Sequence, residues 1–139
     1  MDIVFLLGRV LFAAIFLFSA IGHVAQATPM SQYAESKGVP NAKQGVIASG
    51  IIAGIAGVSI VLGIWIDVGA LLVIAFLVPV SLFMHPFWKE TDPMTKQAEQ
   101  ASFMKNVALI GGALILFYLA NQAQGGLGIT LTDPLFGRG

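Results

Sequence analysis

Four apolar stretches separated by polar segments dominate the pattern of this 139-residue chain, at residues 3–24, 46–66, 68–84 and 103–120. None shows the strict alternation of polar and apolar residues that is typical of a membrane strand. A helix that crosses a bilayer needs about 20 mostly apolar residues. The pattern therefore predicts an all-α integral membrane protein, a four-helix bundle with helices over about 3–26, 44–66, 68–88 and 93–121.

The connections between these helices predict the topology. The second and third helices are separated by little more than Asp67, so we expect antiparallel neighbours joined by a tight turn. The two longer connections, 26–45 and 86–102, then lie on the same face, and each is expected to hold a short interfacial helix. In the first of them we expect this helix from Ser31 to Lys37, with Gly38 as its left-handed stop.

The fourth helix has a recognisable start. Asp92 is expected to be its N-cap and Pro93 its first residue, where the missing N–H of proline costs nothing. Residues 122–139 are rich in glycine and are expected to form an irregular tail. Residues 1–139 are thus predicted to be a single transmembrane domain.

Composition agrees with the membrane interpretation and excludes several functions. Hydrophobic residues make up 57% of the chain and charged residues 10%, against about 25% charged residues in ordinary soluble domains. The chain has no cysteine, which excludes disulfides, thiolate metal sites and thiol redox relays, and no metal site is indicated. Net charge is zero and no block of basic residues occurs, so no nucleic-acid surface is indicated.

Basic residues are distributed unevenly between the two ends of the predicted bundle. The end with the longer connections carries five lysines: Lys37, Lys43, Lys89, Lys96 and Lys105. The positive-inside rule places this end in the cytoplasm and both termini outside.

Small residues recur along one face of the second predicted helix, and two more lie on the fourth. In lipid such residues let helix backbones approach closely, either within one chain or between two copies. The predicted packing residues are Gly45, Ser49, Gly50, Ala53, Gly54, Gly57, Ala108 and Gly112.

Ionisable residues inside the apolar stretches fall into two groups. Arg9 lies near the end of the bundle at which Asp67 is expected, which predicts a structural ion pair. Snorkelling of Arg9 to the surface and binding of a substrate are the alternatives.

The second group lies at the opposite end, where three helices bring polar side chains to one level. A polar pocket is predicted there, although interfacial anchoring explains the same residues. Its members are His23, Gln26, His85, Trp88, Lys105 and Asn106.

The order of several short motifs resembles that of the DoxX family of small bacterial membrane proteins. The motifs are Gly8-Arg9, Gly22-His23, Tyr33-Ala34-Glu35-Ser36-Lys37-Gly38-Val39-Pro40, Leu62-Gly63, His85-Pro86-Phe87-Trp88 and Phe103-Met104-Lys105-Asn106-Val107-Ala108-Leu109. The resemblance implies a four-helix bundle of the bacterial plasma (inner) membrane that serves an oxidoreductase system, with quinone as acceptor in one related branch. Many relatives have a glutamate in the second helix, where this chain has Ser49 and Ala53.

Three functional hypotheses follow. In the first, His23 or His85 hydrogen-bonds a quinone carbonyl while Lys105 and Asn106 stabilise the quinol anion, in a membrane oxidoreductase component that has no redox cofactor motif of its own. In the second, the two histidines ligate a haem, but their position at the membrane boundary argues against it. In the third, the chain is a non-catalytic assembly or accessory subunit. The expected partners are the lipid bilayer and other membrane subunits or further copies of the chain.

Overall fold

The computed structural model describes residues 1–123 and 126–137, and these residues form helices and no strand. The elements are α1 (Asp2–Ala25), α2 (Ala27–Ser36), α3 (Ala42–Leu62), α4 (Ile66–Met84), the short 3-10 helix η1 (Phe87–Lys89) and α5 (Pro93–Gln122). Four of them, α1, α3, α4 and α5, are long and apolar enough to cross a membrane. The candidate span that contains α4 runs on to Lys89 and so includes η1. The predicted all-helical architecture with four candidate spans is confirmed.

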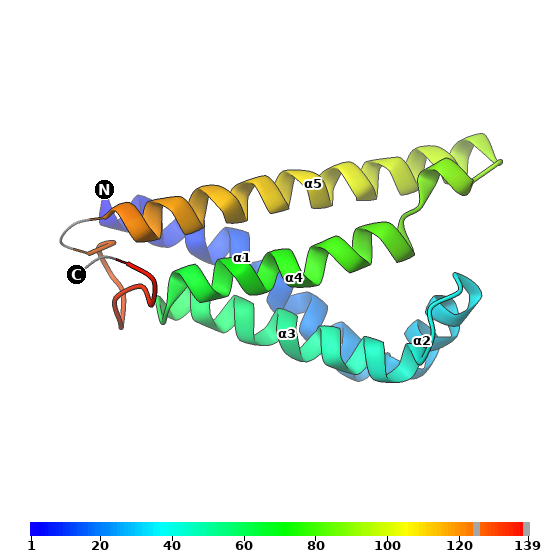
Figure 1. The fold of residues 1–139 in the computed structure, drawn as a ribbon, viewed down its shortest axis with the longest axis horizontal. Helices are drawn as coiled ribbons and strands as arrows, with labels where there is room; N and C mark the ends of the chain where they lie inside the picture. The colour runs from blue at the N-terminus through cyan, green and yellow to red at the C-terminus, as the bar shows by residue number, and fades with distance from the viewer. Residues whose placement is uncertain (124–125, 138–139) are drawn as a thin grey trace.

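The long helices pack in the order α1, α3, α4, α5, and α2 lies against α3. The start of α1 and the described tail, 126–137, lie at one end of the bundle, and α2 and the connection from α4 to α5 lie at the other (Figure 1). The two longer connections therefore share one end, as the tight turn between the second and third predicted helices indicated.

The contact between α1 and α3 depends on glycines of α3. A Cβ atom added at Gly50 would lie 2.6 Å from the Cβ of His23, and one at Gly57 would lie 2.6 Å from Cδ2 of Leu17. The backbones of the two helices therefore approach closely along this face.

The other predicted packing residues have different surroundings. Gly54 faces Ala20 of α1, Gly112 faces Phe12 of α1, and Ala53 is fully buried. Gly45 has no neighbouring atom within 4 Å of an added Cβ, and Ala108 is exposed. These last two residues do not contribute to close helix packing within the chain.

The turn between α3 and α4 lies earlier than predicted. The second helix was expected to reach residue 66, but α3 ends at Leu62 and Gly63 takes the left-handed conformation with φ 69°. Residues 63–65 form the turn, so Asp67 belongs to the first turn of α4. This helix ends at Met84 rather than near 88, because Pro86 disfavours helical geometry at His85.

The short helices and caps follow local sequence signals. α2 begins before Ser31 and ends at Ser36, and Gly38 has a positive φ of 83°. Asp92 caps α5, since its carboxylate accepts a hydrogen bond from the Thr95 backbone N–H at 2.9 Å, and Pro93 is the first helical residue. The hydrogen bonds from the backbone and side chain of Thr95 lower the pKa of Asp92.

The described part of the tail, 126–137, is irregular but packed against the turn between α3 and α4. The N–H of Leu131 donates to the carbonyl of Gly63 at 3.1 Å, and that of Thr132 does so at 3.0 Å. In return the N–H of Trp65 donates to Oγ1 of Thr132 at 2.9 Å. Of the predicted tail, residues 124–125 and 138–139 lie outside the described residues.

Arg9 does not reach the surface, because its side chain is 2% exposed. It donates to three backbone carbonyls: Nε to Ile60 at 2.9 Å, Nη1 to Ile129 at 2.6 Å and Nη2 to Val61 at 2.7 Å. The guanidinium thus joins α1 to the end of α3 and to the tail.

Asp67 has partners of its own. Its fully buried carboxylate accepts hydrogen bonds from the backbone N–H of Leu135 at 3.0 Å and of Phe136 at 2.6 Å. The predicted ion pair between Arg9 and Asp67 is therefore wrong. Arg9 instead binds carbonyls at the end of α3 and in the tail, and Asp67 binds N–H groups of the tail, which sequence spacing could not reveal.

Candidate functional site

A cavity of about 580 Å³ lies between the helices, and side chains from α1, α2, α3, α4 and α5 line it. Apolar and aromatic residues predominate in its walls, among them Phe16, Phe76 and Phe83. Its volume and its mainly apolar lining are typical of a site for a small organic molecule.

Four of the six residues of the predicted pocket line this cavity: His23, His85, Lys105 and Asn106. The other two do not. Gln26 is exposed at the end of α1. Trp88 is half exposed and packs against Phe87 and Phe103, with ring centroids 5.3 and 5.7 Å away.

His23 is 9% exposed and belongs to the cavity wall. Its Nδ1 lies 2.6 Å from the backbone carbonyl oxygen of Ser19. Because a carbonyl oxygen only accepts hydrogen bonds, this contact is a hydrogen bond in the form of the ring that carries a proton on Nδ1, and the hydroxyl oxygen of Ser19 lies 3.3 Å from the same nitrogen. The ring also packs edge-to-face against Phe76, with centroids 5.8 Å apart.

Asn106 is 4% exposed, yet its side-chain amide makes no hydrogen bond within the described residues. Among the fully enclosed side-chain nitrogen and oxygen atoms of the described residues, only Oδ1 of Asn121 lacks a hydrogen-bond partner. The unpaired polar atoms of Asn106 are therefore accessible from the cavity that the residue lines.

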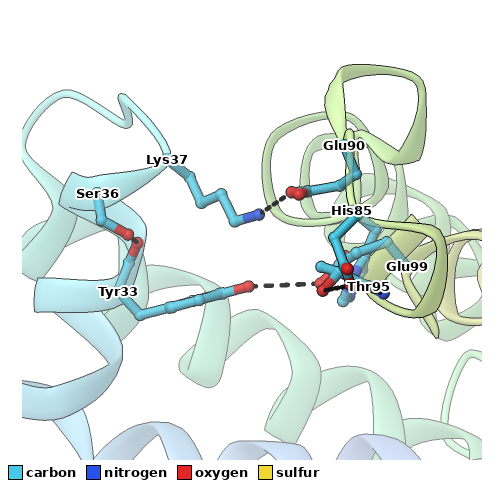
Figure 2. A network of polar contacts seen from close by, with 8 residues as sticks. Tyr33, Ser36, Lys37, His85, Glu90, Thr95 and Glu99 are labelled. Carbon is cyan, nitrogen blue, oxygen red and sulfur yellow. Dashed lines mark hydrogen bonds and ion pairs between the residues drawn. The ribbon is translucent and has the colours of Figure 1, made fainter. Parts of the chain in front are cut away.

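His85 belongs to a polar network that joins the two longer connections (Figure 2). Its Nδ1 lies 2.7 Å from Oε2 of Glu99, and the hydroxyl of Tyr33 donates to Oε1 of the same carboxylate at 3.5 Å. Glu99 and Tyr33 were not among the residues predicted for the polar pocket. Glu99 lies in the polar first part of α5, and no local spacing indicates its partner on another element.

A second contact across the same end joins Lys37 after α2 to Glu90 after η1, at 3.0 Å (Figure 2). The two side chains are 18% and 24% exposed. Hydrogen bonding to the Glu90 carboxylate raises the pKa of Lys37 above its usual 10.5. The stabilisation from this contact is therefore fully present below pH 10.5. It is lost as the pH rises through the raised pKa of Lys37.

Replacing Lys37 by methionine is expected to loosen α2 from the segment after η1. A partly exposed ion pair contributes less than about 1 kcal/mol, so the mobile population should rise by less than about fivefold. The cysteine-free chain allows one spin label at S36C, whose mobility electron paramagnetic resonance reports at any pH. Raising the pH through the raised pKa of Lys37 should mobilise this label in the parent chain too.

Lys43→Met provides the control, because Lys43 is exposed in the first turn of α3 and forms no ion pair in the parts of the chain that the structure describes. Equal mobility changes in the two variants would contradict a specific contact between Lys37 and Glu90.

Comparison with protein families gives a match to this chain. The model of the DoxX family matches residues 4–86, more than half of the chain. The match runs from α1 to just beyond α4 and includes His23 and His85. No curated protein and no solved structure matches the chain.

Proposed function

The chain belongs to the DoxX family, and on this premise we propose that it is a quinone-interacting membrane component of an oxidoreductase system. Roles related to oxidoreductases are often linked to this family. The four helices that can cross a membrane give the chain access to lipid-soluble ligands.

The cavity is the observation that carries this proposal. It combines a mainly apolar and aromatic wall with a few polar groups, among them His23, His85, Lys105 and Asn106. A quinone has the matching chemistry, an apolar ring with polar oxygens. Its ring would pack against Phe16, Phe76 and Phe83.

His85 and Lys105 are suited to the oxygen atoms of such a ligand. When protonated, His85 pairs with Glu99 through Nδ1 and can donate its Nε2–H to a quinone carbonyl. Lys105 is exposed while lining the cavity, so its ammonium group can stabilise negative charge on a bound oxygen. Glu99, outside the apolar part of α5, can exchange a proton with His85. The chain has no cysteine for an iron–sulfur cluster, so electrons would pass between the quinone and another subunit.

The same proposal includes an orientation. The bacterial plasma membrane would hold the four long helices, with α2 and η1 at its cytoplasmic interface. The lysines at that end favour this arrangement under the positive-inside rule. Both termini would then lie outside the cytoplasm.

Filling the cavity is expected to prevent quinone binding. Gly45 lines the cavity and has space for a larger side chain, so Gly45→Phe should weaken binding of duroquinone by at least about tenfold. Binding would be measured by equilibrium dialysis with the protein in lipid nanodiscs, after subtraction of partitioning into empty nanodiscs.

Gly111→Phe is the matched control, because an added Cβ at Gly111 also meets no atom within 4 Å but the residue does not line the cavity. It should bind duroquinone as the parent chain does. Binding no greater than that of empty nanodiscs, or equal loss in both variants, would contradict the proposed function. Stable co-purification with a membrane enzyme whose activity survives replacement of His85 and Lys105 would instead favour an assembly subunit.

A further inference from the structure

Two polar side chains in the cavity wall are more than nine-tenths buried and have unpaired hydrogen-bonding atoms. His23 is 9% exposed and Asn106 is 4% exposed. Their unpaired atoms are not among the fully enclosed ones of the described residues, so water can reach them in the free protein, and a molecule that displaces this water must satisfy them instead. Their chemistry therefore indicates which groups a bound molecule must carry.

His23 requires a hydrogen-bond donor from the ligand. Its Nδ1–H is already donated to the carbonyl of Ser19, so in the neutral ring Nε2 is left as an acceptor. A buried charge needs a partner, and His23 forms no ion pair in the described parts of the chain. In the neutral form of the ring, Nε2 is therefore free to accept a hydrogen bond from a ligand.

A quinone carbonyl cannot satisfy this requirement, because it too is only an acceptor. The hydroxyl of the reduced form, a quinol, donates to such a nitrogen. Asn106 has both donor and acceptor groups, so its amide can pair with a hydroxyl in either direction. The surrounding surface suits an aromatic ring, since Phe76 packs edge-to-face on His23 and on Phe16.

We propose that the cavity binds a quinol in preference to the corresponding quinone, through a hydroxyl that donates to Nε2 of His23 and pairs with the amide of Asn106. This inference rests on the proposed function and specifies the redox form of its ligand. In this proposal His23 accepts a hydrogen bond from the ligand. The hypothesis drawn from the sequence had a histidine hydrogen-bonded to a quinone carbonyl, which requires the histidine to donate.

Three probes of the same ring size test this preference: duroquinol, duroquinone and duroquinol dimethyl ether. The ether keeps the ring and its substituents but has no O–H donor. With the protein in nanodiscs under anaerobic conditions, duroquinol should bind about tenfold more tightly than either of the other two. Such a ratio corresponds to about 1.4 kcal/mol.

Variants identify the groups responsible. His23→Phe and Asn106→Leu should each reduce the preference for duroquinol over its dimethyl ether to less than about threefold. Gln26→Leu is the control, because Gln26 is exposed near the end of the same helix as His23 and does not line the cavity. It should retain the full preference. Circular dichroism would show that each variant keeps its helices.

The possible results separate this inference from the proposed function. Equal or tighter binding of duroquinone, still abolished by Gly45→Phe, would leave the quinone site standing and overturn the preference for quinol. If none of the three probes binds above empty nanodiscs, both proposals fail. Nitrogen NMR of labelled histidine gives a readout without ligand, in which a proton on Nε2 of neutral His23 would overturn the inference.

Discussion

Asp67→Ala is expected to lower the free energy of unfolding by about 3 kcal/mol, because it removes a buried carboxylate to which the tail is hydrogen-bonded. In the parent chain this carboxylate accepts from the backbone N–H groups of Leu135 and Phe136, at 3.0 and 2.6 Å, and is fully buried. Hydrogen bonds to charged groups contribute about 1.5 to 3 kcal/mol each, and the tail is partly solvated, which reduces the sum. Denaturant unfolding in detergent, followed by circular dichroism, would measure the loss.

A second readout locates the effect. Limited proteolysis should cleave residues 126–137 faster in Asp67→Ala than in the parent chain, since the segment loses its attachment to the start of α4. Asp133→Asn is the control, because Asp133 is exposed in the same segment and accepts no hydrogen bond in the described residues. Unchanged stability and unchanged cleavage in Asp67→Ala would show that the tail is not held by this carboxylate.

Gly50→Ala should destabilise the bundle by about 2 kcal/mol, within the range found for overpacked cores. The added Cβ would lie 2.6 Å from the Cβ of His23, an atom close to the backbone of α1 that cannot rotate away. The two helices must therefore separate. Because His23 lines the cavity, the same variant should also weaken ligand binding.

Two other glycines give graded comparisons for this measurement. At Gly57 the nearest atom is the end of the Leu17 side chain, which can change rotamer, so Gly57→Ala should cost less than Gly50→Ala. Gly111→Ala meets nothing within 4 Å and should be neutral or stabilising by up to about 1 kcal/mol, because alanine favours helices. Similar unfolding midpoints for all three variants would contradict a close contact between α1 and α3 at Gly50.

The four long helices could be predicted because the requirement to span lipid acts on consecutive residues. Their ends were less predictable. The turn after α3 contains Ile64 and Trp65, which are as apolar as the helices on either side, so the pattern of hydrophobic residues extended through it. By contrast, the start of α5 was predicted to the residue, since Asp92 and Pro93 act within their own turn.

The candidate site was predictable only in part. Residues at one end of three apolar helices must lie at a similar level, which brought His23, His85, Lys105 and Asn106 into consideration together. Gln26 and Trp88 satisfied the same argument yet lie outside the cavity, because level does not specify which way a side chain at a helix end points. Glu99 and Tyr33 could not be found in this way, since their contact joins α5 to α2.

By itself the amino-acid sequence determined that this DoxX family member has four helices suited to lipid, where they begin and end to within a few residues, and which polar groups share an end. Only the tertiary structure decided that Arg9 and Asp67 bind backbone groups of the end of α3 and of the tail rather than one another, and that His23, whose Nδ1 contacts the carbonyl of Ser19, lines a cavity. Helix formation depends on neighbours along the chain, and its signals are therefore local. Hydrogen-bond partners depend on how distant segments pack. A single amino-acid sequence does not show which distant segments come into contact, so these partners could not be read from it.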